Sequence, residues 1–89
     1  MPAKFPLGRV VITPGALEKL SPESPLQALA RHVTGDWGEL DRHDKQENER
    51  ALVEGSRLFS VYRDCKQTKF WIITEADRSA TTILLPEEY

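Results

Sequence analysis

The chain has 89 residues, of which 39% are hydrophobic and 29% are charged. This length and composition are typical of one folded domain with a single modest core, spanning residues 1–89. The formal charge of −2 at pH 7 argues against a general nucleic-acid-binding protein, because such proteins normally carry a basic surface. The single cysteine, Cys65, excludes an internal disulfide and every zinc site built on cysteine pairs.

The sequence also lacks the signals of several other protein classes. Its first residues hold no apolar core of a signal peptide, and no apolar run approaches the length of a membrane-spanning helix. We therefore expect a cytoplasmic protein that does not associate with membranes. There is no paired-histidine metal motif, phosphate-binding loop or dinucleotide fingerprint, so we expect neither a metal ion nor a cofactor.

The amino-terminal region predicts an extended segment, a short strand and a short helix. Two prolines within residues 1–7 disfavour a helix there. Residues 8–13, GRVVIT, are rich in β-branched side chains and predict a strand. Thr13 and Pro14 predict the start of a helix, since threonine can cap it and proline fits its first turn.

Two further helices are predicted before the middle of the chain. Ser24 and Gln27 have the spacing of a capping box, and apolar residues at helical spacing follow them. The third helix is predicted to start at Asp41 or Asp44. Gly55 is placed to end it.

After the third helix, the hydrophobic pattern changes to a period of two. It predicts strands at 58–62, 69–75 and 81–85, with turns at 64–68 and 76–80. The expected fold is therefore α+β. Two to three short helices in the first half pack on an antiparallel sheet of three C-terminal strands plus a short N-terminal strand.

Two polar clusters are candidates for a binding surface. Glu75, Asp77 and Arg78 lie in the turn between the last two strands, where a carboxylate could act as a base and the guanidinium could hold a phosphate or an oxyanion. The alternative is a salt-bridged turn in which Asp77 bonds to the backbone. The second cluster is the GDWG loop, with Asp36 and Trp37.

His32 and Trp71 are the other residues with functional potential. In an enzyme, His32 would act with the cluster of Glu75, Asp77 and Arg78. The alternative is a partly buried structural histidine. Trp71 alternates with apolar neighbours along its strand, and an exposed Trp71 would be a hot spot for a protein partner.

The segments HVTGDWG at 32–38 and ITEADRSATTILLPEEY at 73–89 resemble a family of short bacterial proteins carried on plasmids, prophages and genomic islands. These proteins are commonly labelled plasmid-related protein or type I restriction endonuclease subunit M. The resemblance covers nearly the whole chain and implies a mobile-element context, where small proteins adjust host defence, plasmid maintenance or replication. In architecture, helices followed by a late hairpin also resemble barnase and RelE-type ribonucleases, which implies catalytic roles for Glu75, Arg78 and Arg63.

The leading hypothesis is a small non-enzymatic accessory protein of a mobile element that binds a host or element-encoded protein, with defence modulation as one use. Its binding residues would be Asp36, Trp37, Glu75, Asp77 and Arg78. The first alternative is a metal-independent ribonuclease-like enzyme that uses the Glu75 cluster and His32. The second is a self-assembling structural module. We expect a monomer or a homodimer, with a protein rather than a nucleic acid as its general ligand.

Overall fold

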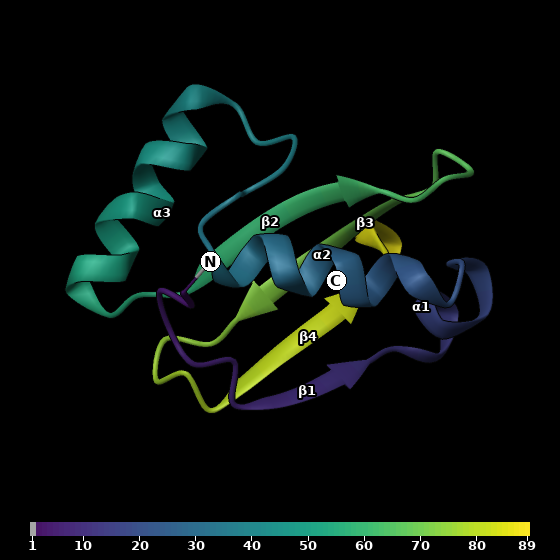
Figure 1. Cartoon of the computed structure of the whole chain (residues 1–89), viewed down its shortest axis with the longest axis horizontal. Helices are drawn as coiled ribbons and strands as arrows, with labels where there is room; N and C mark the ends of the chain where they lie inside the picture. Colours follow the sequence, from purple (N-terminus) through teal and green to yellow (C-terminus); the bar gives the residue numbers. More distant parts are fainter. Residues whose placement is uncertain (1) are drawn as a thin grey trace.

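The computed structural model describes residues 2–89, which form three helices, a four-stranded sheet and a 3-10 turn (Figure 1). The elements in chain order are β1 (Arg9–Ile12), α1 (Pro14–Lys19), α2 (Glu23–Val33), α3 (Arg42–Glu54), β2 (Leu58–Arg63), β3 (Lys69–Thr74), β4 (Ala80–Leu84) and the 3-10 turn η1 (Pro86–Glu88). The α+β class predicted from the sequence is confirmed. No helix among residues 2–89 is both long enough and apolar enough to traverse a bilayer.

The strands are ordered β1-β4-β3-β2 across the sheet. The three C-terminal strands form antiparallel pairs, with Ile72 opposite both Ser60 and Ile83. The N-terminal strand β1 instead pairs parallel to β4, with Ile12 beside Ile83. The sheet is therefore mixed, and its two outer strands are β1 and β2.

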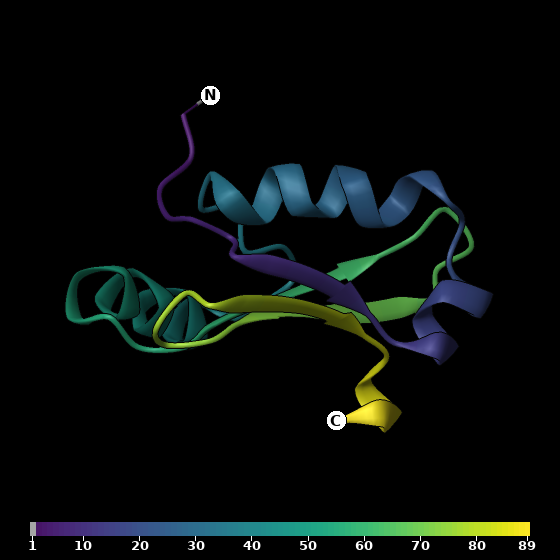
Figure 2. The ribbon, with the colours of Figure 1, turned by 90° about the horizontal axis from the view of Figure 1, so that it is seen from below.

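Helix α2 runs across one face of the sheet, and η1 lies on the opposite side (Figure 2). The main core fills the space under the helix. It contains Ala16, Leu20, Ala28, Tyr62, Phe70, Ile72, Ile83 and Leu85. Because side chains alternate along a strand, the neighbours of Ile72 point away from α2. We call that opposite face, which carries Phe59, Trp71 and Ile73, the open face.

Local capping signals explain where two of the helices begin or end. The side chain of Thr13 accepts a hydrogen bond from the backbone N–H of Ala16 at the start of α1. Asp41 caps α3 in the same way, accepting from the N–H of Asp44. Gly55 ends α3 with a φ of 76°, a left-handed conformation that glycine adopts without steric cost.

The predicted capping box at Ser24 is wrong. Helix α2 begins at Glu23, its N-cap is Pro22, and no side chain caps it. Ser24 therefore lies inside the helix. The prolines at 22 and 25 both fit the start of a helix, because the first four N–H groups have no acceptor within it. The last strand also differs from the prediction, starting at Ala80 rather than Thr81.

The outer edge of β2 is covered by two segments that precede it in the sequence. The carboxamide of Asn48 donates to the carbonyl oxygen of Phe59 at 2.5 Å and accepts from its N–H at 3.1 Å. Beyond it, the N–H of Glu39 donates to the carbonyl oxygen of Val61, whose own N–H donates to the carbonyl of Trp37. These contacts use the outward backbone groups of Phe59 and Val61, so this edge is closed to further strands.

Candidate functional site

Arg78 joins the β3–β4 turn to the end of α3. Its guanidinium donates to the carbonyl oxygens of Ser56 at 2.6 Å, Glu75 at 3.1 Å and Ala51 at 3.1 Å. The Ala51 carbonyl also accepts from the N–H groups of Gly55 and Ser56, so the guanidinium adds a further donor at the end of α3. The guanidinium also lies over the ring of Phe5, 5.8 Å from its centroid. The hydrogen bonds of the Arg78 side chain are therefore with backbone carbonyls of its own chain.

The acidic residues of the same turn are also engaged locally. The carboxylate of Asp77 accepts hydrogen bonds from the side chain and backbone N–H of Ser79, and both lower the pKa of Asp77. The Glu75 carboxylate lies 3.7 Å from the guanidinium of Arg57, with both side chains about half exposed. This arrangement corresponds to the salt-bridged, backbone-bonded turn that is the alternative to a site.

His32 belongs to α2, and its side chain lies in the core between this helix and the sheet, where it is 0% exposed. Its Nδ1 is 2.6 Å from Ser60 Oγ, and its Nε2 is 2.9 Å from Thr74 Oγ1. The Thr74 hydroxyl lies in turn 2.8 Å from that of Thr81. Burial lowers the pKa of His32 to about 4, and the positive charge of Arg78 contributes in the same direction. The imidazole is therefore neutral at pH 7, and it fixes α2 to the centre of the sheet through hydroxyl groups.

The side chains of the GDWG loop have structural contacts as well. Trp37 is 4% exposed, and its indole N–H donates to the Glu49 carboxylate at 2.7 Å. The Asp36 carboxylate accepts two hydrogen bonds from Arg31, at 2.7 and 3.2 Å. Those bonds lower the pKa of Asp36. Trp37 is thus a core residue, and Asp36 is the half-exposed partner of an arginine.

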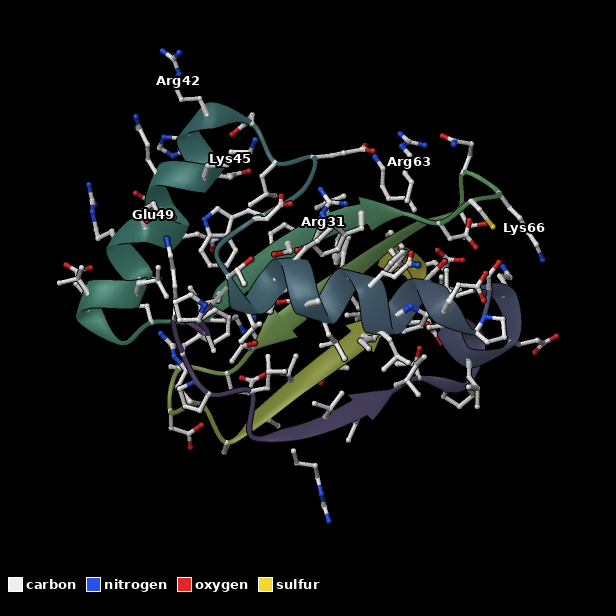
Figure 3. All side chains as sticks on the ribbon, in the orientation of Figure 1. Arg31, Arg42, Lys45, Glu49, Arg63 and Lys66 are labelled. Atoms are coloured by element: carbon white, nitrogen blue, oxygen red, sulfur yellow. The ribbon has the colours of Figure 1, made fainter. Side chains whose placement is uncertain are left out.

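Basic side chains on the α2 side of the molecule are interspersed with carboxylates (Figure 3). Arg31 is paired with Asp36, and the Arg63 guanidinium lies 2.9 Å from the carboxylate of Glu39. The charges of Arg31 and Arg63 are therefore offset by neighbouring carboxylates.

An apolar hollow of about 300 Å³ lies on the open face. We call it the aromatic hollow, and it is lined by Arg57, Phe59, Trp71, Ile73 and Tyr89. The rings of Phe59 and Trp71 meet edge to face at 5.0 Å, and those of Trp71 and Tyr89 at 5.7 Å.

The aromatic hollow depends on strand register and on the C-terminal turn. Phe59 lies opposite Ile73 in the sheet. Trp71 precedes Ile73 by two residues in β3 and therefore lies on the same face. The turn η1 follows Leu84 and brings Tyr89 back toward these strands. Arg57 donates to the Tyr89 hydroxyl at 2.7 Å, and this hydrogen bond raises the pKa of Arg57. A cationic donor therefore stands at the rim of an otherwise apolar surface.

A second hollow, of about 400 Å³, shares Arg57 and Phe59 with the aromatic hollow. Its other side is α3, which contributes three carboxylates and one further arginine, namely Asp44, Glu47, Glu54 and Arg50. The two hollows therefore adjoin at Arg57 and Phe59, and we call them together the groove, which is apolar over the sheet and charged beside α3.

The sequence predicts Trp71 as a hot spot if exposed, but it does not predict its companions. Phe59 and Tyr89 are thirty residues apart, and only the return of η1 places them together. The structure does not bring His32 into the groove, nor Asp36, Trp37, Asp77 or Arg78 into its lining. Within residues 2–89, no three His, Cys, Asp or Glu side chains are arranged to hold a metal ion.

Comparisons of the chain with protein-family models, with curated proteins and with solved structures gave no match.

Proposed function

We propose that the chain is a small non-enzymatic binding protein whose aromatic hollow receives an apolar side chain of a protein partner. The observation that carries this proposal is the aromatic cluster beside Arg57 on the open face, in which Phe59 and Trp71 are partly buried and Tyr89 is exposed. Tryptophan, tyrosine and arginine are the residues that most often dominate the binding energy of protein interfaces. Aromatic rings also supply a large contact area at a small cost in side-chain entropy.

The charges beside the hollow specify the kind of segment that fits. Next to the apolar lining, the α3 side of the groove carries three carboxylates against the guanidiniums of Arg50 and Arg57. Arg50 lies 3.5 Å from Glu47, which leaves Asp44 and Glu54 to attract a cation. The fitting partner segment therefore carries an apolar anchor with a lysine or arginine close to it.

The other candidate residues support binding over catalysis. A general acid or base must reach the substrate within hydrogen-bonding distance, and His32 is fully buried. Arg78 is engaged by three backbone carbonyls. The mobile-element context belongs to the same proposal, so the partner would be a protein of the bacterial host or of the element.

The test is affinity capture from the bacterium that carries the gene, with variants of the aromatic hollow. Tyr89 is 70% exposed, so Tyr89→Ala should leave the fold intact while removing one wall of the hollow. The matched control is Val53→Ala, because Val53 is 87% exposed on α3. We expect one stoichiometric partner with the wild type and the control, and an affinity about thirtyfold lower with Tyr89→Ala, as for a hot-spot residue worth about 2 kcal/mol.

Trp71→Phe provides a second variant that keeps an apolar ring on the strand. It should weaken the same partner while the melting temperature stays close to that of the wild type. The proposal fails if no stoichiometric partner is captured, or if the captured protein binds both hollow variants as tightly as the control.

A further inference from the structure

No segment among residues 2–89 covers the outer edge of β1. In Figure 1 none of these residues lies beyond β1 on the side away from β4, and Figure 2, which looks from that side, shows β1 in front of the sheet. The N–H groups of Arg9 and Thr13 donate toward β4. Since backbone groups alternate in direction along a strand, the N–H and C=O groups of Val10 and Ile12 point outward. The other edge, β2, has its equivalent groups bonded by Asn48 and residues 37–39.

Apolar side chains surround this free edge. Val10 and Val11 are 43% and 40% exposed, and alternation places them on opposite faces of the sheet. Leu17 and Leu26 are 67% and 71% exposed, and with the two valines they line a hollow of about 250 Å³. Natural proteins protect free edges with charges, prolines or bulges, whereas β1 carries a single charge, at Arg9.

We propose that the occupant of this edge is a second copy of the chain, paired antiparallel to β1 about a two-fold axis. Val11 of one copy faces Val11 of the other on the axis. Val10 faces Ile12 of the second copy, and the reverse pair is equivalent, so the outward N–H and C=O groups of both residues are used. The two four-stranded sheets join into one continuous sheet, and both α2 helices lie on the same side of it.

Charge complementarity selects this orientation. In the proposed register Arg9 lies opposite Thr13 of the second copy, on the open face. The Thr13 hydroxyl donates to the Glu88 carboxylate, which also accepts from the N–H of Gly15. Each Arg9 therefore comes next to a carboxylate of the other copy, and the two Arg9 side chains lie at opposite ends of the interface. A parallel pairing would place them side by side, which is unfavourable.

The same arrangement limits the assembly to two copies. A two-fold axis uses the same edge on both chains. The remaining edges of the joined sheet are the two β2 strands, which are covered. This interface is separate from the aromatic hollow, so the failure of one proposal would not contradict the other.

Sedimentation velocity across a range of concentrations tests the dimer, with Val11→Lys as the variant. Two ammonium groups beside the axis should raise the dissociation constant at least about a hundredfold, since like charges at an interface cost several kcal/mol. Val53→Lys introduces the same side chain on the exposed face of α3 and should leave the constant unchanged. A wild type that remains monomeric at about 100 µM, or a Val11→Lys protein that dimerises like the wild type, overturns the proposal.

Disulfide cross-linking tests the register. In a Cys65→Ser background, Val11→Cys should oxidise to a covalent dimer, because a pair on the axis that shares no hydrogen bonds has Cα atoms about 4.5 Å apart. Val10→Cys should stay uncrosslinked, because the two substituted residues would be separated by roughly 8 Å. Equal cross-linking of both variants, or none with Val11→Cys, would exclude the proposed pairing.

Discussion

At the residue scale, His32 shows how a polar side chain can be fully buried without an ionic partner. Both ring nitrogens have hydroxyl partners, from Ser60 and Thr74, so neither leaves an unsatisfied group in the core. The arrangement suits the neutral ring only, since hydroxyl partners cannot offset the desolvation of a buried charge.

Because His32 is buried in its neutral form, the free energy of unfolding should fall as the pH falls. The pKa of His32 is about 4 in the folded protein, compared with 6.5 for a histidine outside the folded structure. The unfolded chain therefore binds a proton that the folded chain excludes between these values. The contribution of the neutral His32 ring to the stability of the fold is complete above pH 6.5 and declines as the pH falls toward 4. We expect the free energy of unfolding to drop by about 2 kcal/mol from pH 7.5 to pH 5, measured by urea unfolding.

The control for this prediction is His32→Gln, which removes the titrating group but retains a polar side chain. It should be less stable than the wild type at pH 7.5, yet its stability should change much less over the same range. Equal pH dependence in both proteins would show that other groups, such as the carboxylates, account for the acid sensitivity.

At the element scale, the side chain of Asn48 bonds the backbone groups on the edge of β2 that a neighbouring strand would otherwise bond. Its single carboxamide satisfies the N–H and C=O of Phe59 from the side of α3. Asn48→Ala exposes both groups within a partly buried edge. We expect a loss of about 2 kcal/mol in the free energy of unfolding, since unsatisfied buried groups cost about 1–3 kcal/mol.

The comparison for Asn48→Ala is Gln46→Ala, an amide removed from the exposed side of the same helix. That change should alter stability by less than about 0.5 kcal/mol. The Asn48 variant should also associate at high concentration, because the part of the β2 edge at Phe59 is now open. A stability equal to that of the Gln46 variant would mean that the carboxamide contributes nothing to the edge.

The elements that the sequence predicts best are those defined by local chemistry. Thr13 and Gly55 mark their helix ends through contacts a few residues away, and the structure has them in these roles. Of the two predicted starts of α3, Asp41 and Asp44, the structure has Asp41 as the cap. The cap at Ser24 fails because prolines on either side allow an earlier start. The sequence does not predict the bonds of Asn48 to Phe59, because they depend on how α3 meets the sheet.

The residues of the candidate site also divide into those that the local sequence indicates and those that only the tertiary structure brings together. Alternation indicates that Trp71 would be a hot spot if its face were exposed, yet alternation does not specify which face α2 covers. Tyr89 joins the hollow only through η1, and nothing near it in the sequence indicates the contact. The polar cluster at Glu75–Arg78 is prominent in the sequence because turns that connect helices and strands need polar side chains for their backbone groups.

At the scale of the whole molecule, the pairing of β1 with β4 closes the longest loop in the fold. Ile12 and Ile83 are neighbours in the sheet, although most of the chain separates them. Contacts of high sequence separation form late when local hairpins can form first. We expect β2, β3 and β4 to form the folding nucleus and β1 to add afterward.

Stopped-flow folding kinetics can check this order. Ile12→Ala in β1 should cost about 2 kcal/mol and act mainly by accelerating unfolding, with little change in the folding rate. Ile72→Val in the central strand should cost about 1 kcal/mol and slow folding. A folding rate that falls for the Ile12 variant in proportion to its lost stability would place β1 in the nucleus instead.

The position of β1 also matters while the protein is being made. It is the first strand to leave the ribosome, but its neighbour β4 is the last. At a synthesis rate of about 5–20 residues per second, the interval between them is on the order of several seconds to ten seconds. During that time both edges of β1 lack a strand, and the apolar run Val10–Ile12 is accessible to other nascent chains and to chaperones. Expression of this protein should therefore depend on chaperone capacity more than its small size suggests.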